Sequence, residues 1–258
     1  MNSGAGQVEQ VLALIPGFSQ AWVESRLSNG PTNASYLLEN SGERFVLRLD
    51  KPEARTLGLD RVNEKRVCEA VAEAGLALAP IHFDPEAGVY LRHFRPGRSW
   101  AASDLAVAAN RRRLAALLRR LHSVEPVGKD FDPLAAARRY AAQTEEGHAG
   151  SILREAESLA AELALEPAAR VLCHNDLVCE NVLEGQQLML IDWEYAAIGD
   201  PFFDLAVVVR HHDLDEPAAM DFLAAYLGRE VEQRDSQRLA GQCAFYHCLL
   251  QLWNLRVA

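Results

Sequence analysis

The stretch VLCHNDLVCENVLEGQQLMLIDWEYAAIGDPFFDLAVVV, residues 171–209, decides the fold of this chain. It places acidic, amide and imidazole side chains between short apolar runs, where a buried core would carry few of them. Val182-Leu183 and residues 188–191 are typical of two short strands around a turn that contains Gly185. The segment therefore predicts a β-hairpin with polar groups at its open end.

Two of these polar residues, Asn181 and Asp192, flank the expected hairpin. A two- or four-residue loop would pair them directly across the two strands. Their Cβ atoms would then lie about 4.5–5.5 Å apart, close enough for both side chains to bind one hard cation such as Mg²⁺. A three-residue loop would shift this pairing and weaken the argument. Asp176 lies on the loop that enters the hairpin.

The order of these residues favours phosphoryl transfer. This reaction needs positioning, a metal ion that neutralises phosphate charge, and a carboxylate that orients the attacking hydroxyl and accepts its proton. Asp176, just outside the expected metal pair, fits the last task. Taken singly, each polar residue is better explained as a turn or core residue. The pattern H-x-D-x-x-x-x-N, followed by an apolar hairpin and I-D-W-E, favours the catalytic interpretation because it is long and ordered.

HNDLVCEN and LIDWEYAAIGDPFFDLA resemble the catalytic segment of the aminoglycoside phosphotransferase and choline/thiamine kinase superfamily, small-molecule relatives of the eukaryotic protein kinases. The resemblance implies an α+β, two-lobed protein-kinase-like fold with a small antiparallel-sheet N-terminal lobe and a mainly helical C-terminal lobe. It also implies ATP and Mg²⁺ as cofactors, Asp176 as the catalytic carboxylate, and Asn181 and Asp192 as the metal ligands. By the same resemblance, three residues support the catalytic loop: His174, Asp200 and Asp204.

The region before residue 96 predicts a strand-rich lobe. Residues 34–50 alternate in polarity around Ser41-Gly42, which predicts a hairpin. Residues 60–75 predict a helix with Asp60 as its N-cap, and residues 88–94 predict a further strand. Arg95-Pro96-Gly97 is typical of a linker, so we expect lobes at 1–95 and 96–258.

Residues after 100 predict a helical lobe. An apolar stripe predicts a helix that ends near His122, and residues 133–163 predict helices that are interrupted around 147–150. Asp200 precedes a proline that begins a helix, which gives it a plain capping role. The last helix is expected to bury one continuous face, formed by Leu239, Cys243, Tyr246, Leu250, Trp253 and Val257.

In the first lobe, the resemblance implies a nucleotide site. The cluster SNGPTN, residues 28–33, resembles the loop that covers the ATP phosphates, with Thr32 and Asn33 as polar contacts. Arg48 takes the place of the phosphate-pairing lysine of protein kinases, and Glu64 would be its ion-pair partner. The alternative for this pair is a solvated strand arginine and a surface glutamate. Residues 91–94, with Leu91 and His93, would form the hinge beside adenine.

The phosphoryl acceptor is harder to infer. A small cationic alcohol such as choline, ethanolamine or thiamine would need carboxylates or aromatic faces near Asp176, and the candidates are Trp193, Glu194 and Trp253. The alternatives are an aminoglycoside or other antibiotic phosphotransferase, for which the acidic residues at 213–216 could line a pocket, and a catalytically silent binding module. For Trp253 and Tyr246, core packing is the favoured alternative, because both lie on the apolar stripe of the last helix.

Composition sets outer limits on the function. The formal net charge of −10 argues against a protein that coats nucleic acid. No apolar stretch approaches the length of a membrane span, and the first residues do not resemble a secretory signal, so we expect a cytoplasmic protein without a membrane partner. Only three of the 26 basic residues are lysines. A phosphate-binding cation is therefore expected to be arginine.

Overall fold

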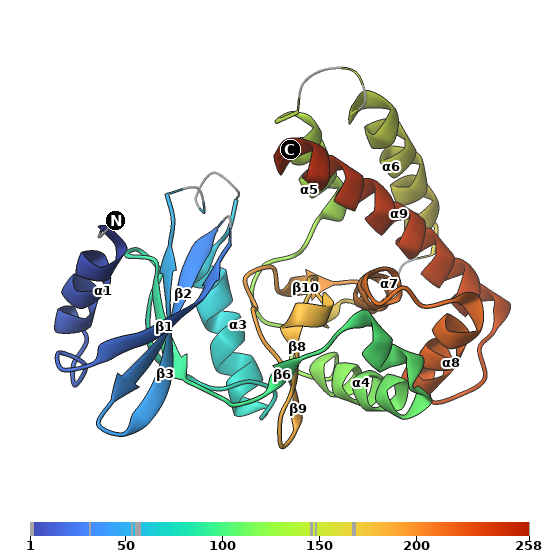
Figure 1. Ribbon diagram of the computed structural model, residues 1–258. Coiled ribbons are helices and arrows are strands. Elements are labelled where there is room, and N and C mark those ends of the chain that lie inside the picture. Colours follow the sequence, from blue (N-terminus) through green and yellow to red (C-terminus); the bar gives the residue numbers. More distant parts are fainter. Residues whose placement is uncertain are drawn as a thin grey trace. The chain divides into compact units, whose positions relative to one another are not determined.

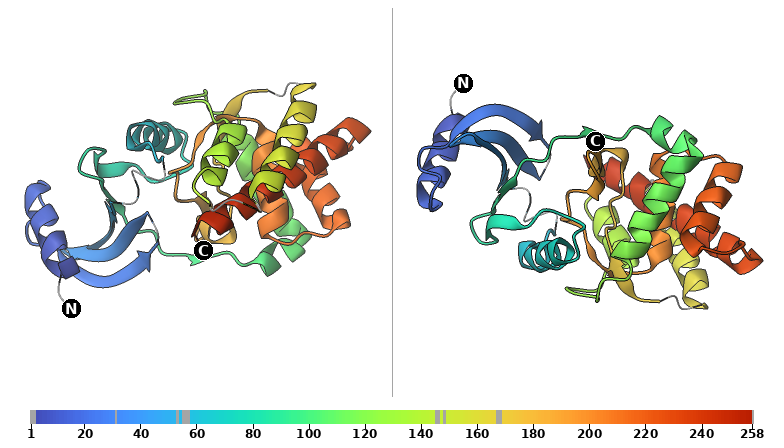
Figure 2. Two further views of the ribbon diagram at one scale, coloured as in Figure 1. Left: turned by 90° about the horizontal axis from the view of Figure 1, so that it is seen from above. Right: turned by 90° about the horizontal axis from the view of Figure 1, so that it is seen from below.

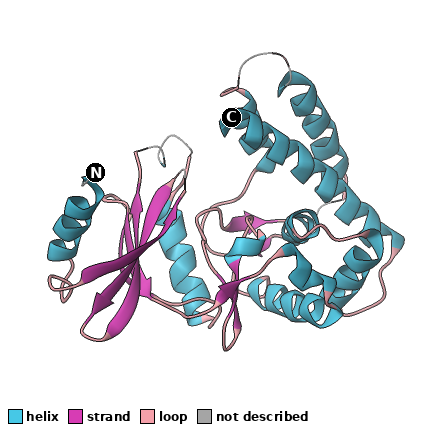
Figure 3. Cartoon of the chain, viewed as in Figure 1, coloured by secondary structure: helices cyan, strands magenta, loops and turns pink. Residues whose placement is uncertain are grey.

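The computed structural model describes residues 3–30, 32–52, 54, 58–144, 147, 149–166 and 169–257. The chain forms two compact units, Met1–Pro96 and Gly97–Ala258, whereas the sequence analysis placed the boundary after residue 95. Strands dominate the first unit and helices the second (Figure 3).

The first unit is a five-stranded antiparallel sheet with helices on both faces (Figure 1). The strands lie in the order β1-β2-β3-β5-β4. Its elements are α1 (Ser3–Leu14), β1 (Trp22–Asn29), β2 (Asn33–Asn40), β3 (Glu43–Asp50), α3 (Arg61–Glu73), β4 (Pro80–Asp84) and β5 (Val89–His93).

The predicted hairpin is confirmed as β2 and β3. Asn40 pairs with Glu43, so Ser41 and Gly42 form a two-residue loop. Both have positive φ, 55° and 85°, which is the conformation that a type I′ turn requires. Gly42 adopts it without steric cost, and the loop therefore fixes the register that places Arg48 opposite Ser35.

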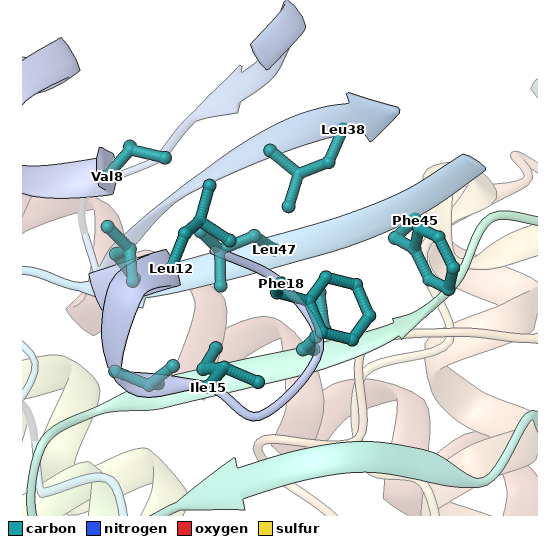
Figure 4. Packing of buried hydrophobic residues seen from close by; sticks show 10 residues of the cluster. Val8, Leu12, Ile15, Phe18, Leu38, Phe45 and Leu47 are labelled. Carbon is teal, nitrogen blue, oxygen red and sulfur yellow. The ribbon is translucent and has the colours of Figure 1, made fainter. Parts of the chain in front are cut away.

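Alternation along β3 divides its side chains between the two faces of the sheet. Phe45 and Leu47 are buried in an apolar cluster with Leu12 of α1 and with Phe18 (Figure 4), and the rings of Phe18 and Phe45 meet edge to face with centroids 4.9 Å apart. Arg48, on the opposite face, reaches α3. The period of two thus separates an apolar core from a polar site.

Helix α3 begins as the sequence predicts. Asp60 caps it by accepting a hydrogen bond from the backbone N–H of Asn63 at 2.9 Å. The helix ends at Glu73, and Gly75 follows with a φ of 67°, the left-handed conformation that favours glycine after a helix.

The second unit is mainly helical, with two small sheets that frame the polar loop. Strands β6, β8 and β9 form one sheet, and β7 pairs with β10 in the other. Its elements are β6 (Arg98–Ser99), the 3₁₀ helix η1 (Ala102–Ala106), α4 (Ala108–Leu121), α5 (Pro133–Ala141), α6 (Ala149–Ala164), β7 (Val171–Cys173), the 3₁₀ helix η2 (Cys179–Asn181), β8 (Val182–Glu184), β9 (Leu188–Leu190), β10 (Ala197–Gly199), α7 (Pro201–His211), α8 (Glu216–Leu227) and α9 (Gln233–Val257).

Helix α9 organises the helical unit. It packs against α5, α6 and α7 (Figure 2), while α4 packs against α8. The predicted single buried face of α9 is only partly right. Leu239 and Tyr246 are buried, but Cys243 and Trp253 are half-buried, and Phe245 is buried although it lies off the expected stripe. Contacts with three helices bury a wider surface than one apolar stripe predicts.

No helix in the described ranges is both long enough and apolar enough to cross a membrane. The longest, α9, has charged and polar residues throughout its first half.

Candidate active site

The loop between β7 and β8 carries the predicted catalytic residues, and Asp204 holds its first part. The backbone N–H groups of His174 and Asn175 donate to the two carboxylate oxygens of Asp204 at 2.8 and 2.7 Å. Asp204 is fully buried on α7, and Asn175 has a φ of 64°, which asparagine tolerates better than most residues. Asp204 thus fixes the loop where its backbone reverses.

The structure also shows why position 174 carries a histidine. The Nε2 atom of His174 lies 3.0 Å from the backbone oxygen of Ile191, so the ring links the catalytic loop to the segment that contains Asp192. The ring is fully buried and its centroid lies 4.6 Å from that of Trp193. Burial lowers the pKa of His174, which keeps the ring neutral near pH 7.

Sequence reasoning missed one member of this support. His122, at the end of α4, places Nε2 3.1 Å from Oδ2 of Asp204 and Nδ1 2.7 Å from the hydroxyl of Tyr226. The sequence showed His122 only as the end of a helix. Its role depends on contacts with α7 and α8, which no local pattern reveals.

Asp176 and Asn181 are brought together as the catalytic interpretation requires. The amide nitrogen of Asn181 donates to the backbone oxygen of Asp176 at 2.8 Å and to its carboxylate Oδ2 at 3.0 Å. Because both contacts use the amide nitrogen, the amide oxygen is the atom that a cation would contact. The 3₁₀ turn η2 makes this possible by folding residue 181 back toward residue 176.

Several acidic groups crowd this loop. Burial, together with the negative charges of Asp192 and Glu194, raises the pKa of Asp176 to about 8. The hydrogen bond from Asn181 acts in the opposite direction but does not cancel these effects. A divalent cation beside these carboxylates would offset their repulsion and favour the ionised form of Asp176.

The register of the hairpin differs from the predicted one. Val182 pairs with Leu190, so the loop has three residues, and the N–H of Ile191 donates to the backbone oxygen of Asn181 at 3.0 Å. Asn181 therefore faces Ile191 rather than Asp192. The sequence of the turn does not distinguish a three-residue loop from a four-residue one.

Asp192 still lies at the same end of the hairpin, one residue beyond the pair. Its side chain is exposed, its φ is 66°, and its charge acts on both Asp176 and His174. Asn181 and Asp192 offer oxygen ligands, as Mg²⁺ prefers. The donor set fits that ion, and the assignment of the two residues as its ligands is a prediction.

The three candidate acceptor residues have different surroundings. Trp193 is only 4% exposed and packs against His174, which favours a packing role over direct substrate contact. Glu194 is half-buried and close enough to Asp176 to affect its pKa. Trp253 is half-buried, and its ring packs edge to face against Tyr140 with centroids 5.3 Å apart.

Tyr246, by contrast, is a core residue. It is 7% exposed, packs against Phe203, and shares a hydrogen bond of 2.6 Å with His211. Tyr195, which the sequence analysis did not select, lies in the same region as Trp253, with ring centroids 6.4 Å apart. Aromatic residues were visible in the sequence, but nothing showed which of them meet.

Asp200 has the capping role that the sequence predicts. It accepts a hydrogen bond from the N–H of Phe202 at 2.9 Å at the start of α7. Its other oxygen binds Arg238 and Gln242 of α9. Asp200 therefore also ties α7 to α9.

In the first unit, the predicted pair of Arg48 and Glu64 is present and buried. The guanidinium donates to both carboxylate oxygens at 2.6 and 2.8 Å, and it lies over the ring of Tyr90. Sequence reasoning missed Arg61, which donates to Glu64 at 2.7 Å and bidentately to Asp50. Two arginines thus share one buried glutamate, and Asp50 balances the second positive charge.

Thr32 and Asn33 are both buried, and the Asn33 amide donates to the Thr32 hydroxyl at 3.0 Å. Pro31, in the middle of the predicted phosphate loop, lies outside the described residues. Their proposed contact with ATP remains a prediction.

The two predicted hinge residues lie on β5, and their contact with adenine stays a prediction. Leu91 is fully buried in the apolar cluster of α1, and its strand is paired on both sides, by β3 and β4. Its side chain therefore contributes to the core of the first unit. His93 is exposed at the end of the strand and stacks against Phe45 with centroids 5.0 Å apart.

Comparison with known proteins gives this arrangement a family. Residues 24–241 match the model of the phosphotransferase enzyme family. This chain belongs to the phosphotransferase enzyme family. Its catalytic loop, hairpin and α7 all lie within the matched residues, as does the Arg48–Glu64 pair.

Sequence relatives of this chain include proteins named LicA. One from Haemophilus influenzae strain Rd is 32% identical over 207 residues, which are 74% of this chain and 74% of the relative. Another from the same species is 32% identical over 209 residues, 75% of this chain. The match spans 59% of the length of that second relative.

Solved structures confirm the α+β, two-lobed protein-kinase-like fold. A choline/ethanolamine kinase family protein from Mesorhizobium loti has a TM-score of 0.80 at 24% identity and covers 97% of this chain and 85% of its own. A LicA structure in complex with AMP has a TM-score of 0.83 at 22% identity, covering 99% and 91%. An aminoglycoside-3′-phosphotransferase of type VIII has a TM-score of 0.68 at 21% identity, covering 97% and 100%.

Proposed function

We propose that this phosphotransferase is a small-molecule kinase that transfers the γ-phosphoryl group of ATP to the hydroxyl of a small cationic alcohol of the choline, ethanolamine or thiamine type. The observation that carries the proposal is the contact of Asn181 with Asp176, close to the charges of Asp192 and Glu194. Such a site brings together a carboxylate for the acceptor and oxygen ligands for a cation.

The geometry supports a role for each residue in this proposal. Asp176 would orient the acceptor hydroxyl and take its proton. Asn181 and Asp192 would hold Mg²⁺, which neutralises phosphate charge when bound. Arg48, kept in place by Glu64, would pair with nucleotide phosphates, since a guanidinium can bind carboxylate and phosphate oxygens together. The AMP bound to the LicA relative supports a nucleotide as cosubstrate.

Two observations favour a cationic acceptor. The LicA relative from Streptococcus pneumoniae is a choline kinase. In this chain, Tyr140, Tyr195 and Trp253 form an aromatic group, and the negative charge of Asp176 acts on both tyrosines. Ammonium groups bind aromatic faces, so an acceptor with an ammonium group could reach both this group and Asp176.

The antibiotic phosphotransferase alternative receives less support. It was based on the acidic residues at 213–216, but Asp215 accepts a hydrogen bond from the N–H of Ala218 at 2.8 Å and caps α8. Asp215 therefore has a structural task. A catalytically silent binding module is disfavoured because the chain carries both Asp176 and Asn181, and their side chains are hydrogen-bonded to each other.

The test is Mg²⁺-dependent release of ADP from ATP, with choline, ethanolamine, thiamine, simple sugars and kanamycin offered in parallel. We expect one of the three cationic alcohols to stimulate release, and we expect its phosphorylated product in the mass spectrum. Stimulation by kanamycin or a sugar alone would replace the proposed acceptor class. Absence of ATP binding would overturn the kinase assignment.

A further inference from the structure

Arg256, in the last turn of α9, has unusual surroundings. Its guanidinium carbon lies 3.7 Å from the centroid of the Trp253 ring and 5.0 Å from that of Tyr140. Tyr140 belongs to α5, and Tyr195 packs edge to face against Trp253 from the loop that follows β9. Arg256 thus lies against the rings of Trp253 and Tyr140, and Tyr195 packs against the first of these rings.

The guanidinium is held by these rings and not by a carboxylate. Nε, Nη1 and Nη2 of Arg256 are all buried and have no hydrogen-bond partner within the part of the chain that the structure describes. Burial lowers the pKa of this group. Arg48, Arg61 and Arg98, in contrast, each bind a carboxylate with two nitrogens, the usual use of the planar fork.

The same rings lie next to the catalytic loop. The side-chain amide of Asn175, the residue before Asp176, donates to the backbone oxygen of Tyr195 at 3.0 Å. Burial raises the pKa of Tyr140 and of Tyr195, and the negative charge of Asp176 raises both further. All of these residues belong to one compact unit, Gly97–Ala258. The cation that stacks on Trp253 is therefore near the carboxylate that we assign to the acceptor hydroxyl.

We propose that Arg256 occupies the ammonium subsite of the acceptor and competes with cationic acceptors for the faces of Trp253 and Tyr140. This inference rests on the proposed function for its link to catalysis. A ring face that already carries a guanidinium at 3.7 Å cannot stack a second cation at the same place, and two like charges repel strongly where the first of them is buried.

The competition makes Arg256 a determinant of acceptor affinity. A cationic alcohol binds only after the Arg256 side chain turns away from the rings. The free energy needed for this movement weakens acceptor binding. The flexible arginine side chain can move, whereas the rings that form the subsite stay packed. Quaternary ammonium groups, which form no hydrogen bonds, depend most on the ring faces and are affected most.

The first test measures binding without catalysis. Tetramethylammonium is titrated by calorimetry into the wild-type protein and into Arg256→Ala. We expect affinity to rise at least about fivefold in the variant, because the ring faces become open to the probe. Unchanged or weaker binding in Arg256→Ala would overturn the inference. Arg256→Gln replaces it if the alanine variant does not fold.

Two variants control this measurement. Arg234→Ala removes the same side chain from the first turn of α9, roughly 33 Å away along the helix axis, where Arg234 is exposed and pairs with Glu232. We expect it to bind tetramethylammonium as the wild type does. The double variant Arg256→Ala/Trp253→Ala should lose the gain, and a retained gain would show that the ring is not the site.

The second test connects the subsite to catalysis. If choline is an acceptor, Arg256→Ala should lower its KM by a similar factor and change kcat by less than about twofold, because Asp176 keeps its contacts. Tighter tetramethylammonium binding in a variant that phosphorylates none of the alcohols would support the subsite and overturn the proposed function. Tighter binding with an unchanged KM for an accepted alcohol would overturn the link between them.

Discussion

Asn181 donates from one amide nitrogen to both the backbone oxygen and the carboxylate of Asp176, at 2.8 and 3.0 Å. This double contact closes the catalytic loop on itself and leaves the amide oxygen as the atom for a cation. It also explains why the two residues need a fixed spacing. The 3₁₀ turn at Cys179–Asn181 brings the second residue back to the first, which a longer or shorter loop would not do.

Replacement of Asp176 by asparagine should stop catalysis while it preserves the loop. The amide is nearly isosteric with the carboxylate but cannot accept the proton of the acceptor hydroxyl. We expect kcat to fall by about 10²–10⁴ and the affinity for Mg·ATP to change little, measured by ADP release and by calorimetry. Glu180→Gln removes one charge from an exposed residue of the same loop and should leave kcat near normal. Near-normal turnover in Asp176→Asn would refute the catalytic assignment.

Asp192→Asn should weaken nucleotide binding only when Mg²⁺ is present. Asparagine suits this position because the residue has a φ of 66°, a conformation that strains most other residues. The substitution therefore removes the charge without a backbone penalty. We expect the affinity for ATP to fall at least about tenfold with Mg²⁺ and to stay unchanged in EDTA. An equal affinity for Mg·ATP in the variant and the wild type would contradict the role as a metal ligand.

The buried pair of Arg48 and Glu64 should be costly to break and cheaper to remove. Glu64→Gln leaves Arg48 buried without its counter-charge, and we expect a loss of about 3–5 kcal/mol in the free energy of unfolding. The double variant Arg48→Met/Glu64→Leu should lose much less, since no buried charge stays unpaired, while Arg61 keeps Asp50. Both should lower the affinity for ATP.

A matched surface pair controls this experiment. Arg44 and Glu24 in the same sheet also form an ion pair, but Arg44 is 55% exposed. Glu24→Gln should cost under about 1 kcal/mol in urea unfolding. A similar loss of unfolding free energy for Glu24→Gln and Glu64→Gln would show that burial does not increase the cost of breaking the pair of Arg48 and Glu64.

Short-range features of this chain could be predicted from its sequence, and their reasons are physical. The two-residue loop at Ser41-Gly42 and the alternation along β3 fix which face Arg48 occupies. The next helix, α3, carries Glu64 in its first turn, and Arg48 on that face of the sheet pairs with it. The periods of strand and helix are local properties, so a single sequence carries them.

Contacts that depend on exact loop length or on distant segments were not predictable. The hairpin closes with a three-residue loop, so Asn181 faces Ile191 and not Asp192. A shift of one residue in the pairing also turns each side chain of a strand to the other face. His122 meets Asp204, and Arg256 meets Tyr140, only because separate helices pack together. Nothing near these residues in the sequence indicates their partners.

Acid should destabilise the first unit through Glu64. Burial alone would raise the pKa of this carboxyl, but the charges and hydrogen bonds of Arg48 and Arg61 outweigh it and hold the pKa below its usual value of 4.5. A carboxyl whose pKa is lower in the folded state stabilises the fold fully above the unfolded value. That contribution is lost as the pH falls below about 4.5 and through the folded pKa.

Glu64→Gln should therefore make the free energy of unfolding depend less on pH under acid conditions. Urea unfolding would be measured at pH 6, 5, 4 and 3.5. Hydrogen exchange in peptides from β2 and β3 would monitor the unfolding of the first unit. We expect the difference in unfolding free energy between the wild type and Glu64→Gln to be constant from pH 6 to 5 and to shrink below pH 4.5, because the protonated wild-type carboxyl resembles the neutral amide. A difference that stays constant down to pH 3.5 would mean that Glu64 keeps its charge throughout this range or that the pair contributes nothing to acid sensitivity. A difference that grows with acidity would contradict the sign of the pKa shift.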